Sequence, residues 1–140
     1  MILNTFSIFC DDIRQEIGDK NTFVGSYSGE LIAQRLPIVL PKLCVVVFCI
    51  YDTKQQDTDA SITIEILLGN EKIASAEYPL KEVYSENSDN GSNVIQANFI
   101  FTPVEINKPN ILRAIIREGD KVHENMGLII RSTTPPADSE

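Results

Sequence analysis

Hydrophobic residues recur at every second position in several short segments of this chain. In residues 61–68, Ile62, Ile64 and Ile66 alternate with serine, threonine and glutamate. Successive side chains of an extended strand point to opposite faces, so this period predicts a half-buried β-strand. Residues 72–78, 95–101 and 112–117 show the same alternation, and Gly69-Asn70 between the first two segments is typical of a hairpin turn. The pattern predicts an all-β protein.

Three further strands are predicted, at residues 6–10, 22–27 and after the turn at 118–120. In the first, the alternation indicates that Phe6, Ile8 and Cys10 point into the core. In the last, the inward residues are predicted to be Met126, Leu128 and Ile130. Together with the apolar run at residues 43–51, these segments predict about eight strands.

Helical signals are short. Asp12 with Gln15 three residues later resembles a capping box, and Gly18 is typical of a helix end. Residues 80–84, after Pro79, predict a second turn of helix. Neither segment is long enough to connect parallel strands, so we expect a mostly antiparallel β-sandwich of immunoglobulin-like or C2-like outline.

The length of the chain fits one domain. Its 140 residues allow a single hydrophobic core, which we assign to residues 1–131. Residues 132–140 contain two prolines and no apolar anchor, and they predict a flexible tail.

Residues 43–51 (LCVVVFCIY) depart from the alternation because they are apolar on both faces. Such a run predicts a strand that is covered on both sides. In one interpretation this is a central strand whose outer face lies under a loop. In the other, that face is an interface between copies of the chain, formed by Cys44, Val46, Phe48 and Ile50.

The charge of the chain limits its partners. A net charge of −8 disfavours binding to nucleic-acid phosphates and to anionic membranes. No apolar run reaches the roughly 18 residues of a membrane span, and the N-terminus lacks the positive charge of a secretion signal. Cys44 and Cys49 lie too far apart on one strand to form a disulfide, and the third cysteine makes the count odd. We therefore expect reduced thiols and a cytoplasmic location.

The N-terminal half resembles a family of small bacterial and phage proteins that is catalogued as a domain of unknown function. The similarity lies in a strand that ends in a Cys-Asp pair, a Gly-x-Tyr strand and a Pro-x-x-x-Pro step into an apolar strand. The residues concerned are 6–16, Lys20, 24–27, Leu36-Pro37 and 40–43. The resemblance implies a bacterial or phage β-sandwich, and it implies no activity or site residues.

Two candidate sites for chemistry emerge. Asp11 and Asp12 form an acidic pair near the end of a strand, where carboxylates of C2-type sandwiches bind Ca²⁺. The alternative is that Asp12 caps a helical turn while Asp11 is solvated. A Cys–His nucleophile would require the single histidine, His123, to lie beside a cysteine, but its position in the alternation places it on the outer face.

These observations favour a non-enzymatic module that binds another protein or a second copy of itself. No catalytic residue and no cofactor are predicted. The alternative is a Ca²⁺-dependent binding domain that uses Asp11 and Asp12, and a small hydrolase is a third hypothesis.

Overall fold

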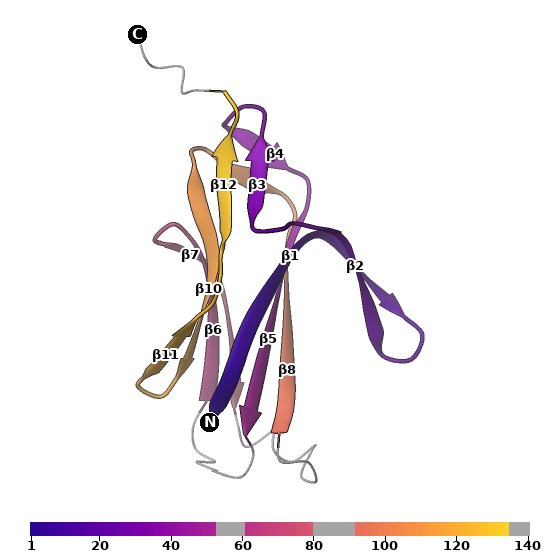
Figure 1. Ribbon diagram of the computed structural model, residues 1–140, viewed down its shortest axis with the longest axis vertical. Helices are drawn as coiled ribbons and strands as arrows, with labels where there is room; N and C mark the ends of the chain where they lie inside the picture. Colours follow the sequence, from indigo (N-terminus) through magenta and orange to yellow (C-terminus); the bar gives the residue numbers. More distant parts are fainter. Residues whose placement is uncertain (53–60, 80–91, 135–140) are drawn as a thin grey trace.

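The computed structural model describes residues 1–52, 61–79 and 92–134, which form twelve strands and no helix (Figure 1). The predicted all-β class is confirmed. The eight longer strands correspond to predicted segments, the predicted last strand is divided into β11 and β12, and β3, β4 and β9 are short additions. The strands are β1 (Ile2–Glu16), β2 (Lys20–Ser26), β3 (Glu30–Ala33), β4 (Ile38–Leu40), β5 (Leu43–Asp52), β6 (Ser61–Leu68), β7 (Glu71–Pro79), β8 (Ser92–Phe101), β9 (Val104–Ile106), β10 (Asn110–Glu118), β11 (Lys121–Glu124) and β12 (Leu128–Ser132).

The strands form two main sheets, which we call sheet A and sheet B. Sheet A has the order β2-β1-β5-β8, and sheet B has the order β3-β12-β10-β6-β7 with β11 paired to β10. A separate ribbon joins β4 and β9. Every pairing is antiparallel except that of β3 with β12, so the predicted mostly antiparallel sandwich is confirmed.

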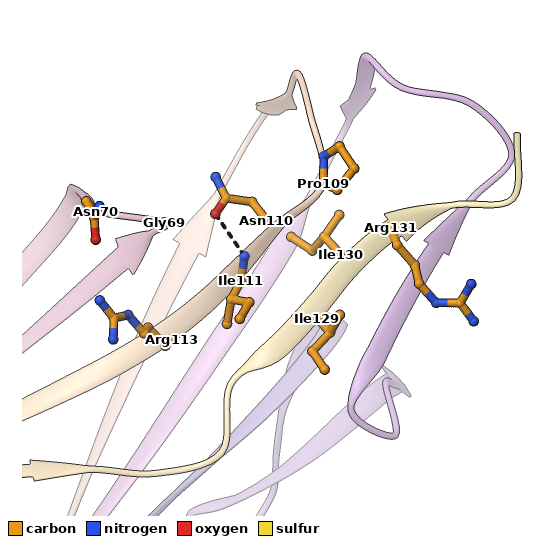
Figure 2. Close-up of a pocket in the computed structure, with 9 residues that line it drawn as sticks. All are labelled: Gly69, Asn70, Pro109, Asn110, Ile111, Arg113, Ile129, Ile130 and Arg131. Carbon is orange, nitrogen blue, oxygen red and sulfur yellow. Dashed lines mark hydrogen bonds between the residues drawn. The ribbon is translucent and has the colours of Figure 1, made fainter. Parts of the chain in front are cut away.

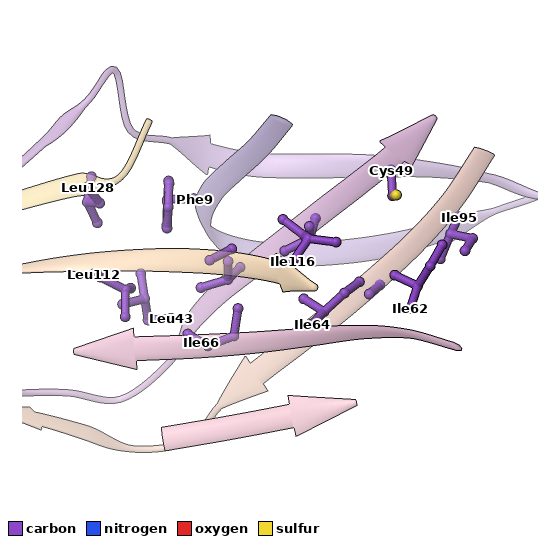
Figure 3. Close-up of a cluster of buried hydrophobic side chains, with 14 of the residues drawn as sticks. Phe9, Leu43, Cys49, Ile62, Ile64, Ile66, Ile95, Leu112, Ile116 and Leu128 are labelled. Atoms are coloured by element: carbon purple, nitrogen blue, oxygen red, sulfur yellow. The ribbon is translucent and has the colours of Figure 1, made fainter. Parts of the chain in front are cut away.

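The main core lies between the two sheets (Figure 3). Ile62, Ile64 and Ile66 of β6 are fully buried, as their alternation predicted. They pack against Leu43, Val45, Val47, Cys49 and Tyr51, which form one face of β5. Two aligned sheets whose inner side chains interdigitate in this way define a β-sandwich.

The predicted inward face of β1 is wrong. Ile2 and Phe9 belong to the main core, whereas Phe6, Ile8 and Cys10 point to the other side of sheet A. The pairing with β5 decides this, because Ile8 is opposite Val46 and Cys10 is opposite Cys44. Residues opposite each other on neighbouring strands share a face.

The predicted helical turn after Asp12 is also wrong. β1 continues to Glu16 and forms a hairpin with β2, in which Glu16 is opposite Lys20. Gly18 and Asp19 have φ angles of 90° and 56°, which is the left-handed conformation that tight hairpin turns require. The second predicted turn, at residues 80–84, lies outside the described residues.

Of the three residues predicted to point inward in the last strand, Met126 does not, since it is 81 % exposed. Leu128 and Ile130 are buried as predicted. The first residues of the predicted tail are hydrogen-bonded, since the backbone N–H of Thr133 donates to the Ala33 carbonyl at 2.9 Å. Residues 135–140 lie outside the described part. The part of the chain that the structure describes contains no helix capable of crossing a membrane.

The orientation of β1 can be tested with Phe9→Ala and Phe6→Ala. Phe9 is 5 % exposed, so its truncation is expected to lower the free energy of unfolding by about 3–5 kcal/mol. Phe6 is 41 % exposed, and its truncation is expected to cost about 1–2 kcal/mol. Urea denaturation of both variants measures the difference, and the reverse order would contradict the orientation described here.

Candidate interaction surface

The side of sheet A that points away from sheet B is apolar and uncharged along most of its strands. We call it the outer face of sheet A. The register of β1, β5 and β8 places on it Asn4, Phe6, Ile8, Cys10, Cys44, Val46, Phe48, Ile50, Val94, Gln96, Asn98 and Ile100. Between them these twelve side chains present apolar groups, thiols and neutral amides, and the register adds one carboxylate, Asp52, at the end of β5.

Several large side chains on this face are open to solvent. Val94 is 59 %, Ile100 is 52 % and Phe6 is 41 % exposed. Phe6 stacks on Phe48 with a distance of 4.6 Å between the ring centroids. Phe48 and Ile50 are half-buried. An apolar group of this extent on one sheet is a recognised mark of an interaction surface.

The hairpin formed by β1 and β2 covers the other part of the face. Ile13 and Phe23 of the hairpin pack on a second small core made of Cys10, Cys44 and Val46, all of which are fully buried. The four residues of β5 that were predicted to form an interface therefore lie in two different environments. Cys44 and Val46 lie beneath the hairpin, whereas Phe48 and Ile50 lie next to the exposed part of the face.

Polar contacts hold the hairpin in place. The Tyr27 hydroxyl donates a hydrogen bond to Asp11 Oδ1 at 2.7 Å, and burial together with this bond raises the pKa of Tyr27 to about 12. Lys42 Nζ donates to Asp12 Oδ1 at 2.6 Å. That hydrogen bond lowers the pKa of Asp12 and raises the pKa of Lys42.

The two aspartates of the calcium hypothesis thus have protein partners. Asp11 binds Tyr27 and Asp12 binds Lys42, and as neighbours in an extended strand their side chains point in opposite directions. In residues 1–52, 61–79 and 92–134, no three His, Cys, Asp or Glu side chains are grouped as metal ligands. The calcium hypothesis stays a prediction from the sequence.

The predicted position of His123 on the outer face of its sheet is wrong. His123 is opposite the buried Ile116, so it belongs to the inner side of sheet B, near the end of the sandwich. Its Nε2 lies 4.0 Å from Glu118 Oε1 and has no hydrogen-bond partner among the described residues. Glu118 also accepts a hydrogen bond from the backbone N–H of Ile2 at 3.1 Å.

The three thiols are poor nucleophiles. Burial raises the pKa of Cys10 to about 11 and that of Cys49 to about 12, and it also raises the pKa of Cys44. Cys10 and Cys44 are opposite each other on β1 and β5, and each Sγ donates to a backbone carbonyl, that of Asp12 and that of Asp11 respectively. Since the thiolate is the reactive form, these cysteines act as small apolar residues.

Sheet B presents a different outer surface. Ile111 and Ile129 are each 46 % exposed, but they are interspersed with ion pairs. Arg131 Nε lies 2.9 Å from Glu30 Oε2, and Arg113 Nη1 lies 2.9 Å from Glu124 Oε1. This face is therefore solvated and charged, unlike the outer face of sheet A.

A shallow depression of about 550 Å³ lies at one end of sheet B (Figure 2). It is lined by Gly69, Asn70, Pro109, Asn110, Ile111, Arg113, Ile129, Ile130 and Arg131. Both arginines are paired with glutamates, and the lining includes no histidine, cysteine or serine. The depression brings none of the predicted site residues together.

Comparisons with family models, curated proteins and solved structures gave no match to this chain. The resemblance of the N-terminal half to a bacterial and phage family stays a prediction.

The native protein is expected to resist thiol-specific reagents at pH 8. A pKa of about 11 leaves roughly one part in a thousand of Cys10 as thiolate at that pH, and the other two thiols are also shifted upward. Iodoacetamide labelling followed by mass spectrometry measures each cysteine, with the protein unfolded in guanidinium as the control. Labelling of a native thiol at the unfolded rate would contradict this prediction.

Gly25→Ala is expected to displace the hairpin. Gly25 has a φ of 67°, and a Cβ atom there would collide with the Asp11 carboxylate, which cannot turn away without losing its bond to Tyr27. Cys10 and Cys44 should then be labelled faster, while Cys49 in the main core should stay protected. Gly18→Ala is the matched control, because Gly18 also has a positive φ but has open space around it. Equal labelling in the two variants would contradict the prediction.

Proposed function

We propose that this chain is a non-enzymatic interaction module that binds another protein through the outer face of sheet A. The observation that supports this most strongly is the contrast between the two outer surfaces of the sandwich. Both expose large apolar side chains. On sheet B these are interspersed with ion pairs, whereas on sheet A the ion pair of Lys42 with Asp12 lies at the hairpin and not among the exposed apolar residues of β1, β5 and β8.

The composition of the outer face is that of an interface centre. Centres of protein interfaces are depleted in charge and enriched in aromatic side chains. On this face the stacked pair of Phe6 and Phe48 lies among aliphatic residues and the amides of Asn4, Gln96 and Asn98. Phenylalanine, like tyrosine and tryptophan, contributes strongly to the free energy of binding at interfaces because each ring buries a large area.

The charge of the chain supports a protein as the partner. With 20 acidic against 12 basic residues, the chain repels phosphate backbones and anionic lipid surfaces. An uncharged apolar surface on such a chain is suited to a partner that offers apolar side chains of its own.

The proposal is tested by a matched pair of substitutions, Phe6→Lys on the outer face of sheet A and Ile111→Lys on that of sheet B. The two residues are 41 % and 46 % exposed. With the wild-type chain as bait in its native cell, the captured protein is identified and its dissociation constant is measured for each variant. We expect Phe6→Lys to weaken binding at least about tenfold and Ile111→Lys to leave it unchanged.

Thermal melts of both variants show whether the fold is intact. Equal affinity of wild type and Phe6→Lys, or loss of binding in Ile111→Lys alone, would contradict the proposal.

A further inference from the structure

β8 is the last strand of sheet A, and it differs from the other edge strands of the sandwich. β5 pairs with it along its whole length, and no strand among the described residues pairs with its other side. Its ten residues contain no charged residue and no proline. At about 3.4 Å per residue, this leaves roughly 34 Å of strand edge.

The other edges have the features that prevent strands from pairing with a further chain. β7 contains Glu71, Lys72, Glu77 and Pro79, and its pairing with β6 has an irregularity. β3 and β11 are only four residues long. Charged side chains, prolines, bulges and short length are the usual protection of sheet edges, and β8 has none of them.

The two remaining edges of sheet A are protected in other ways. β2 carries Lys20 and contains Gly25 in a left-handed conformation. In the first half of β1, the backbone N–H of Ile2 donates to Glu118 Oε1, and Asn125, between β11 and β12, is hydrogen-bonded to the side chains of Thr5 and Ser7. β8 is the exception among the described edges.

The central residues of β8, 94–100, are symmetric about Ala97 in their chemistry, whereas the fourth pair, Asn93 and Phe101, is not. Reading outward from Ala97, the first neighbours are the amides Gln96 and Asn98. The next pair is apolar, Ile95 and Phe99, and so is the third, Val94 and Ile100. A strand with this symmetry presents the same order of side chains to an antiparallel copy of itself.

We propose that β8 pairs antiparallel with β8 of a second copy of this chain, with the two-fold axis at Ala97. In this register Val94 lies opposite Ile100 of the other copy, Ile95 opposite Phe99, and Gln96 opposite Asn98. A shift of the axis to residue 96 or 98 would place apolar side chains opposite amides. A change of the register by one residue would place outer-face side chains of one copy opposite inner-face side chains of the other.

The exposure of the residues agrees with this register. Val94, Gln96, Asn98 and Ile100 are exposed on the outer face, so their counterparts in the second copy can reach them. Ile95 and Ala97 are buried within each copy and keep their place on the inner side. Gln96 Nε2 already donates to Asn98 Oδ1 at 3.1 Å, and in the pair each amide gains a second amide across the axis.

The net charge of the chain also favours the edge of β8 as the contact between two copies. Two copies that each carry −8 repel one another, so contact is least unfavourable where neither contributes a charge. Pairing at β8 would join the two copies of sheet A into one sheet of eight strands. Both outer faces would then lie on the same side, as an isologous two-fold interface requires. This inference depends on a strand edge and does not rest on the proposed function.

The register is tested by charge pairs at Gln96 and Asn98, which are both exposed, so that substitution leaves the core intact. Gln96→Lys/Asn98→Lys places like charges opposite each other twice, and we expect it to raise the dimer dissociation constant at least about tenfold. Gln96→Lys/Asn98→Glu is the matched control, because each lysine then faces a glutamate and the dimer should persist. Mixing the double-lysine variant with Gln96→Glu/Asn98→Glu should restore dimers of mixed composition.

Sedimentation equilibrium and light scattering over a concentration series measure each variant. A wild-type chain that stays monomeric at every concentration would overturn the proposal. So would a dimer that the double-lysine variant leaves intact, and a dimer lost equally in both variants would overturn the axis at Ala97. Phe6→Lys is expected to leave the dimer intact, so failure of this inference and failure of the proposed function give different results.

Discussion

The sandwich depends on β5, a strand that is hydrogen-bonded on both sides and apolar on both faces. Together with its two partners, β1 and β8, it makes up three of the four strands of sheet A. One face supplies the main core with Leu43, Val45, Val47, Cys49 and Tyr51. The other face must be shielded from water in some other way, since leaving large apolar side chains exposed forfeits their burial free energy.

The hairpin of β1 and β2 provides part of that shielding and leaves the rest open. It seals the small core around Cys10 and Cys44 and is held there by the bonds of Tyr27 to Asp11 and of Lys42 to Asp12. Residues that looked like metal ligands thus have a structural role in docking the hairpin. Beyond it, the stacked rings of Phe6 and Phe48 mark the point where shielding ends.

The candidate surface could be predicted only in part from the sequence. The doubly apolar run 43–51 indicated an unusual strand, and Phe48 and Ile50 do lie beside the exposed area. The contributions of Phe6, Val94 and Ile100 were missed, because residues 6–10 contain apolar residues in both alternations and either could have been the inner one. The symmetry of residues 94–100 was visible in the sequence, but it gains meaning only when β8 is known to be an edge.

The sequence alone determined the local structure. The alternation of apolar residues predicted the main strands and the inward residues of β6 and β10, and Gly69-Asn70 predicted the hairpin turn between β6 and β7. The tertiary structure alone decided which face of β1 is inside, why residues 12–16 are extended and which strand lies at an edge. These properties depend on pairing between distant segments, such as Cys10 with Cys44. A helical turn at residues 12–18 would satisfy its own backbone, but it would lose the cross-strand bonds to β2 and expose the small core that Ile13 covers.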